Sequence, residues 1–169
     1  MRFKTCFTIA LLAAFAVPTF AQSDVPAALL AHLKTSRAFT LKVAEQMPEA
    51  TYDFKLTPPQ MSFAGQMVHL SQSFDEYLSP LTGQKPSLRK PASMSKKDVI
   101  AFVGTSFDGA IAIVSKLTAA DLAKTFTSED GKMSGLELIM AMFDHTTHHR
   151  ASAEMYLRAK GITPAEYQF

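Results

Sequence analysis

The chain has very little thiol chemistry and no tryptophan: one cysteine occurs in 169 residues. A lone cysteine excludes an intrachain disulfide, a cysteine-rich zinc site and a Cys-X-X-Cys redox motif. Any metal ion must therefore be held by nitrogen and oxygen atoms. Apolar residues make up 47% of the chain and charged residues 19%, which argues against intrinsic disorder. The length fits one domain.

Long apolar runs are also missing, except near the N-terminus. Residues 1–21 hold two cations, Arg2 and Lys4, then an apolar run over residues 7–17, and they end on Ala21. This is the layout of a secretory signal peptide, and the apolar run is shorter than the roughly 20 residues that span a bilayer. We expect cleavage after Ala21, a secreted or periplasmic protein, and no stable membrane insertion after cleavage.

The apparent excess of positive charge belongs to this leader. The whole chain has a formal net charge of +2, but removing residues 1–21 takes away Arg2 and Lys4 and no acidic residue. The same cut removes Cys6. The expected mature domain, residues 22–169, is thus neutral and has no thiol. Because no basic stripe remains, we do not expect nucleic-acid binding.

Apolar residues recur at helical spacing in four segments, which are expected helices over residues 24–47, 62–80, 95–117 and 134–160. Proline is expected to end the second helix at Pro80, and Gly161 to cap the fourth. Ser95 and Asp98 have the spacing of a capping box, and Thr118 is expected to cap a short extra turn. Four such helices with short connections predict an all-α fold, a four-helix bundle.

Three of the five histidines fall close together on the fourth expected helix. His145 and His149 are four residues apart and share a helix face with Leu138 and Met142, whereas His148 is rotated off that face. Side chains at this spacing are about 5–6 Å apart at Cβ, close enough to share a metal ion. Two histidines on an apolar face can equally be core residues with satisfied hydrogen bonds, and the spacing alone leaves both interpretations open.

A third ligand would have to come from another helix, and His69 is the candidate. The apolar stripe of its own helix points elsewhere, and His69 shares its face with polar residues, namely Ser62, Gln66, Ser73 and Glu76. Taken alone, this pattern predicts an exposed surface histidine. The alternative is a histidine in a polar cleft at an open side of the bundle. His32 or a carboxylate is next in line as a third ligand.

Two blocks of sequence resemble the DinB/YfiT-like family of metal-binding four-helix proteins. They are Ser62–Leu70 and His145–Arg150, the second followed by Tyr156–Gly161. The resemblance implies a three-histidine site for a divalent metal ion, usually zinc or nickel, with His69, His145 and His149 as ligands.

The chain also departs from the family pattern. Ala151 and Ser152 stand where relatives often have Gly-Gln, which puts in doubt any substrate contact of that glutamine. Some relatives are transferases that use small intracellular thiols, and an exported protein would meet little of that cosubstrate.

Three histidine ligands leave a metal ion at least one open position, which is typical of catalytic rather than structural zinc. We therefore expect a metal-dependent hydrolase of a small molecule. The alternatives are a non-catalytic metal-binding or stress-related bundle protein, a thiol-dependent transferase as in some relatives, and a haem-binding bundle. The sequence leaves open whether the chain forms a homodimer.

No side chain stands out as the general base that a hydrolase needs. Glu76 and Asp144 are the nearest carboxylates in sequence, and both are expected to be solvated. Arg150 is expected to form a salt bridge or a cap contact, and Tyr156 to pack in the core.

Overall fold

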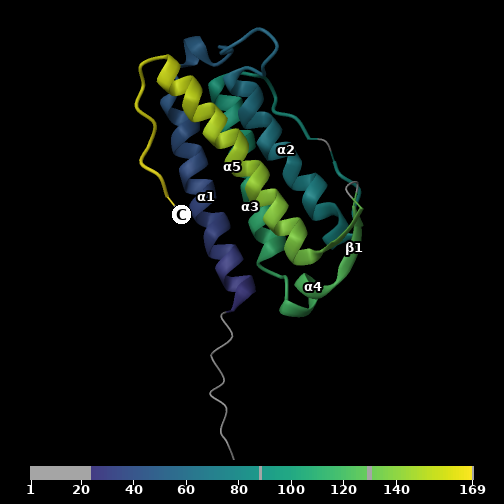
Figure 1. Ribbon diagram of the computed structural model, residues 1–169. Coiled ribbons are helices and arrows are strands. Elements are labelled where there is room, and N and C mark those ends of the chain that lie inside the picture. The colour runs from purple at the N-terminus through teal and green to yellow at the C-terminus, as the bar shows by residue number, and fades with distance from the viewer. Residues whose placement is uncertain (1–23, 88, 129–130, 169) are drawn as a thin grey trace, which may run out of the picture.

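A computed structural model describes residues 24–87, 89–128 and 131–168, and the expected leader, residues 1–21, lies outside the described residues. Four long helices form a bundle (Figure 1), which confirms the all-α class. The elements are α1 (Val25–Gln46), the 3-10 turn η1 (Glu49–Thr51), α2 (Phe63–Thr82), α3 (Lys96–Val114), the short α4 (Ala119–Ala123), β1 (Thr125–Ser128), β2 (Gly131–Ser134) and α5 (Gly135–Ala159). None of the described helices is long and apolar enough to cross a membrane.

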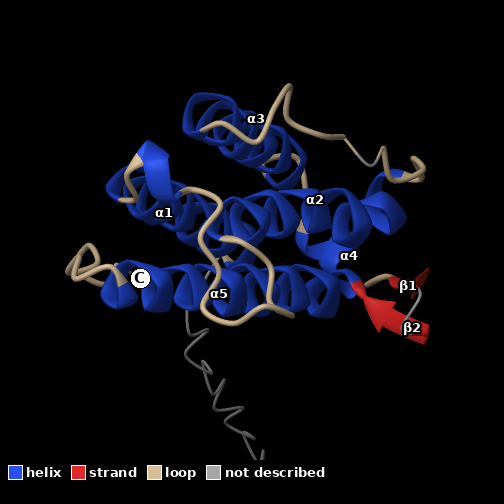
Figure 2. Cartoon of the chain, turned by 90° about the horizontal axis from the view of Figure 1, so that it is seen from above, coloured by secondary structure: helices blue, strands red, loops and turns tan. Residues whose placement is uncertain are grey.

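Helix α2 packs against both α3 and α5, and α1 packs against the other sides of α3 and α5. The two strands form an antiparallel hairpin at one end of the bundle (Figure 2), where β1 contacts α2 and β2 contacts α5. Helix α2 is therefore covered by α3 on one face and by α5 on another.

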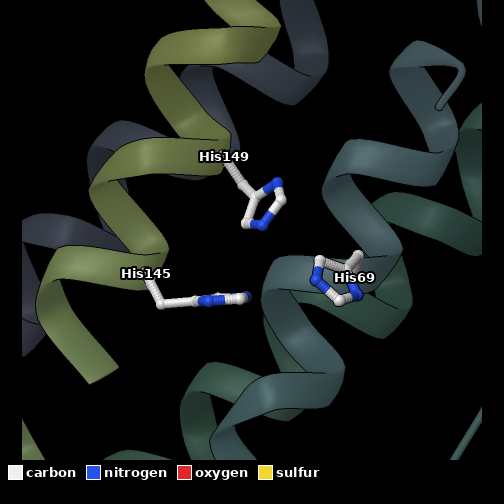
Figure 3. A group of neighbouring side chains, drawn as sticks. All are labelled: His69, His145 and His149. Carbon is white, nitrogen blue, oxygen red and sulfur yellow. The ribbon is translucent and has the colours of Figure 1, made fainter. Parts of the chain in front are cut away.

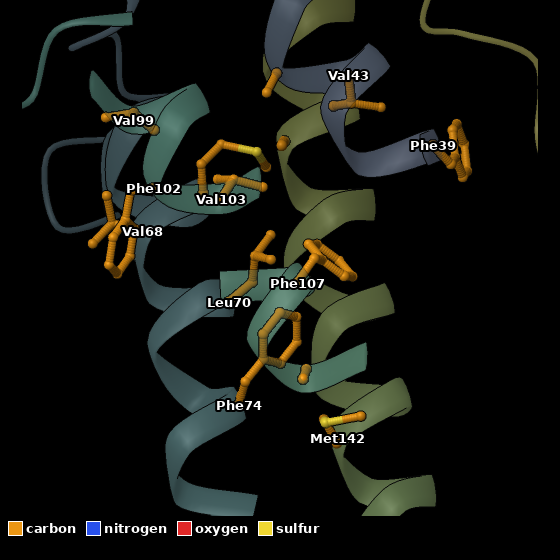
Figure 4. Packing of buried hydrophobic residues seen from close by; sticks show 14 of the residues in the cluster. Phe39, Val43, Val68, Leu70, Phe74, Val99, Phe102, Val103, Phe107 and Met142 are labelled. Atoms are coloured by element: carbon orange, nitrogen blue, oxygen red, sulfur yellow. The ribbon is translucent and has the colours of Figure 1, made fainter. Parts of the chain in front are cut away.

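The core fills the space between the four long helices (Figure 4). The stripe expected on α2 is buried in full: Phe63, Met67, Leu70, Phe74 and Leu78 are each at most 2% exposed. At the centre, the rings of Phe74 and Phe107 meet edge to face with centroids 4.7 Å apart. Burying one such side chain stabilises the fold by about 2 kcal/mol. The bundle is thus held by the helical periodicity that the sequence displays.

The Asp24 carboxylate caps the start of α1, and serine or threonine hydroxyls cap the starts of α2, α3, α4 and α5. At α5, Ser134 and Glu137 form a reciprocal capping box. At α3, Ser95 accepts from the Asp98 amide, but the Asp98 carboxylate accepts from the Ser93 hydroxyl instead of the Ser95 backbone. The capping box expected there is therefore only half formed.

One local expectation was wrong, and one element was not expected. Pro80 does not end its helix, because α2 continues to Thr82 with Pro80 inside it. A proline lacks the N–H that would bond the Glu76 carbonyl, and the Ser79 hydroxyl donates to that carbonyl at 3.0 Å instead. The β1–β2 hairpin was not expected at all, since each strand has only four residues and one large apolar side chain, Phe126 or Met133. At the other end of α5, Gly161 takes the expected left-handed conformation, with φ 74°.

Candidate metal centre

Three histidine side chains converge between α2 and α5 (Figure 3). His69 comes from α2, whereas His145 and His149 come from consecutive turns of α5. The ring centroid of His69 lies 5.0 Å from that of His145 and 4.5 Å from that of His149, and the two α5 rings are 4.5 Å apart. Each ring offers one nitrogen, and these nitrogens all lie within 4.8 Å of one another. The helix spacing i, i+4 thus places two candidate ligands, and the neighbouring helix supplies the third.

The surface interpretation of His69 is wrong. His69 is half-buried and faces the two α5 histidines. The polar face on which it stands is packed against α5, since Gln66 is 8% exposed and Ser73 is 1% exposed. Periodicity detects only the apolar stripe that faces α3 and the core, and it cannot detect a second, polar contact face on the same helix.

A chain of hydrogen bonds fixes the orientation of His149. The Met61 carbonyl can only accept, so the Tyr156 hydroxyl donates to it at 2.6 Å. The Tyr156 oxygen accepts from the Gln66 amide nitrogen at 3.4 Å. The Gln66 oxygen therefore faces Nδ1 of His149, 2.6 Å away, and Nδ1 carries the proton that is donated. Nε2 of His149 is left with a free lone pair for a ligand.

The second nitrogen that fits a metal ion belongs to His145. Its Nε2 is buried and has no hydrogen-bond partner among the described residues. Leaving a buried polar atom unpaired costs about 1–3 kcal/mol. Two nitrogens held at about 2.0–2.1 Å by one ion are at most about 4 Å apart, so modest ring rotations would bring the three together. The residues present therefore fit a divalent ion.

The surroundings of His145 and His149 favour the neutral form of both imidazoles. Burial, followed by the neighbouring His145 and His69, lowers the pKa of His149 to about 4. Burial, followed by His69 and His148, also lowers the pKa of His145. A neutral imidazole is the form that binds a metal ion. The site therefore offers two unprotonated ligands on α5 at neutral pH.

The other two histidines do not join the centre. His32 is exposed on α1 and stacks edge to face against Phe143, with centroids 4.6 Å apart. His148 is exposed, as its rotation off the ligand face predicted, although its ring lies 4.9 Å from that of His149.

The other expected roles have mixed outcomes. Glu76 and Asp144 are exposed, and Tyr156 is in the core at 1% exposure, all as predicted. Arg150 forms neither the expected salt bridge nor the expected cap contact within the described residues. It is 5% exposed, donates to the Ser36 hydroxyl at 3.0 Å and lies over the Phe39 ring.

Two residues of the centre were not singled out from the sequence. Gln66 orients His149, and Tyr77 places its ring 5.8 Å from that of His145. Both follow the helical period from His69, Gln66 three residues before it and Tyr77 eight after it. That shared face was the signal that could have found them.

Comparison with known proteins assigns the fold and the family. The model of the DinB family matches residues 19–169, which is most of the chain. The chain belongs to the DinB family. No curated protein matches it significantly.

Two solved DinB-like proteins share the fold. One, from Bacillus subtilis, superposes with a TM-score of 0.71 at 21% identity, covering 83% of this chain and 96% of that one. Another, from Bacillus cereus, gives a TM-score of 0.74 at 16% identity, covering 83% and 95%. At these identities the likeness extends to the architecture of this DinB family member and no further.

Proposed function

We propose that the domain binds one divalent metal ion, zinc or nickel, through His69, His145 and His149, and that it hydrolyses a small molecule there. The observation that carries the proposal is the ligand set. Three imidazoles converge, and within the described residues the group includes no carboxylate or thiol as a fourth ligand. Structural zinc sites are usually closed by four protein ligands, whereas catalytic ones keep a position open.

A metal ion in this position supplies Lewis-acid polarisation of a carbonyl group. The chain's own residues do the positioning. Gln66 holds the His149 ring through Nδ1, and Tyr156 and Met61 hold Gln66. The Tyr77 ring packs edge to face beside His145, with centroids 5.8 Å apart. In hydrolysis, the oxygen of water bonds to the carbonyl carbon, the bond to the leaving group breaks, and the protons of water end on the products.

The second candidate function is metal binding without catalysis, as in a stress-related bundle protein. The observation in its favour is that, within the described residues, no carboxylate belongs to the histidine group, and that Glu76 and Asp144, the nearest in sequence, are exposed. A hydrolase needs a base within hydrogen-bond reach, directly or through one water molecule.

Elemental analysis combined with a hydrolase panel separates the two. The purified protein is dialysed against zinc or nickel and assayed on esters, amides and lactams, beside His69→Ala, His145→Ala and His149→Ala. His32→Ala is the matched control, since His32 is exposed and lies on α1. We expect each of the three variants, but not the control, to lose metal and activity.

Bound metal with no turnover on any substrate would exclude the hydrolase and leave the non-catalytic protein. Unchanged metal content in all three variants would overturn the site itself.

We also propose that the protein is exported to the periplasm or the medium. The support is the layout of residues 1–21, with its two cations, short apolar run and small residue at the end.

A further inference from the structure

A cavity of about 350 Å³ lies between the end of α2, the loop that follows it and the β1–β2 hairpin. Its walls come from the last turns of α2, from the hairpin and from Leu138 of α5. Small-molecule sites commonly have volumes of about 300–1,000 Å³. A cavity of about 680 Å³ lies between the start of α1 and the α3–α4 connection. No histidine lines either cavity, but Tyr77, whose ring lies next to His145, lines only the smaller one. The smaller cavity is the one that concerns the metal centre.

Tyr77 connects this cavity to the metal centre. Its side chain lines the cavity, and its ring lies 5.8 Å from that of His145. The helix positions agree: Glu76 lies seven residues after His69 on α2, and Leu138 seven residues before His145 on α5. Seven residues rise by about 10 Å along a helix. The cavity therefore lies about 10 Å from the histidines along the helix axes.

The lining of the cavity combines apolar residues with one carboxylate. Tyr77, Pro80, Met133 and Leu138 give it an apolar lining, and Glu76 is the one charged residue among the described residues that line it. No ion pair to the Glu76 carboxylate occurs in the described part of the chain. An ammonium group would be attracted to this carboxylate and a carboxylate ligand repelled.

We propose that this cavity is the substrate subsite of the metal centre and that it takes an amine-bearing molecule with an apolar body. The ammonium group lies beside Glu76, the apolar body lies on Tyr77 and Met133, and the bond to be broken lies about 10 Å away at the histidines. This inference rests on the proposed function for its reaction, but the binding step can be measured without it.

The test uses three probes of equal length: n-hexylammonium, 1-hexanol and hexanoate. Each is titrated into the zinc-loaded, ¹⁵N-labelled protein, and amide shifts are followed by NMR. We expect hexylammonium to shift the amides of Tyr77, Thr127 and Met133 and to bind about fivefold more tightly than hexanoate.

Two kinds of variant test the charge and the volume. Glu76→Gln is expected to remove the preference for the ammonium probe. Asp75→Asn is the matched control, because its carboxylate lies one position away and contacts Ser87 and Arg89 instead. Thr127→Trp, at an exposed strand position, is expected to weaken all three probes about tenfold while zinc content is unchanged. Met133→Trp blocks the same space from the other strand if the first variant fails to fold.

Equal binding of hexylammonium and hexanoate, or shifts confined to other surfaces, would overturn the subsite. Unchanged probe affinity in a folded Thr127→Trp or Met133→Trp protein would do the same. Failure of the hydrolase proposal looks different: metal is bound, the probes bind beside Glu76, and no ester, amide or lactam is turned over.

Discussion

The side-chain oxygen of Gln66 lies 2.6 Å from Nδ1 of His149, across the contact between α2 and α5. This hydrogen bond does two things at once. It decides which nitrogen of His149 carries the proton, and it fixes the direction in which the other nitrogen points. Tyr156 and the Met61 carbonyl hold Gln66 in turn, so the orientation of one candidate ligand depends on three further residues.

Replacing Gln66 should weaken metal binding without removing a ligand. We expect Gln66→Leu to lower zinc affinity by about 10–100-fold, since the loss of such an outer hydrogen bond frees the ring and the tautomer. Gln66→Glu should retain affinity, because a carboxylate also accepts from Nδ1. A competition titration against a chromophoric chelator measures both. Gln72→Leu is the control, because the Gln72 amide donates to the Arg89 carbonyl on another side of α2. Equal affinities of Gln66→Leu and wild type would contradict this role.

The metal-free protein should lose stability as the pH falls. Burial lowers the pKa of His149 to about 4, below the value of about 6.5 in the unfolded chain. Between these values the unfolded state binds more protons, so the free energy of unfolding decreases as the pH falls from about 6.5 towards 4. Urea midpoints across this range measure the effect. We expect a shallower dependence in His149→Gln and an unchanged one in His32→Gln. A free energy of unfolding that increases as the pH falls through this range would contradict the prediction.

A methyl group at Gly135 should be costly. A Cβ there would lie 2.5 Å from the carbonyl oxygen of Asp121 and 3.0 Å from Cα of Leu122, both backbone atoms. We expect Gly135→Ala to destabilise the fold by about 1–3 kcal/mol. Gly104→Ala is the matched comparison, since its Cβ would approach only the Arg37 side chain, at 3.8 Å. It should stabilise α3 by about 0.5–1 kcal/mol. Urea unfolding of both variants measures the change in the free energy of unfolding, which should be negative for Gly135→Ala and positive for Gly104→Ala. Equal stabilities of the two variants would refute the steric argument.

Export predicts a defined N-terminus. We expect mass spectrometry of the protein from the periplasm or the medium to find a chain that begins at Gln22. Ala21→Arg should block cleavage, because the leader peptidase requires a small residue there. A cytoplasmic protein that still carries residues 1–21 would remove the export proposal.

The sequence predicted those parts of the fold that depend on one contact face per helix. The stripe of Phe63, Met67 and Phe74 on α2 is buried as expected. The sequence did not predict the burial of His69 and Gln66, because the second contact face of α2 is polar and shows no hydrophobic periodicity. The pairing of α2 with α5 decides that burial, and such pairing is a property of the assembled bundle.

Likewise, the i, i+4 spacing of His145 and His149 was visible in the sequence, whereas their third partner was not settled by spacing. The end of α2 was misplaced because a side-chain hydroxyl, that of Ser79, bonds the carbonyl that Pro80 leaves free.

The three histidines belong to two helices that are far apart in the chain, His69 to α2 and the others to α5. An ion held by all three would act as a crosslink between these helices and would bind only the folded state. By mass action, free ion at 100 times its dissociation constant would add about 2.7 kcal/mol to the free energy of unfolding. The melting temperature of this bundle would then rise with the concentration of free metal ion around it, whether or not any substrate is present.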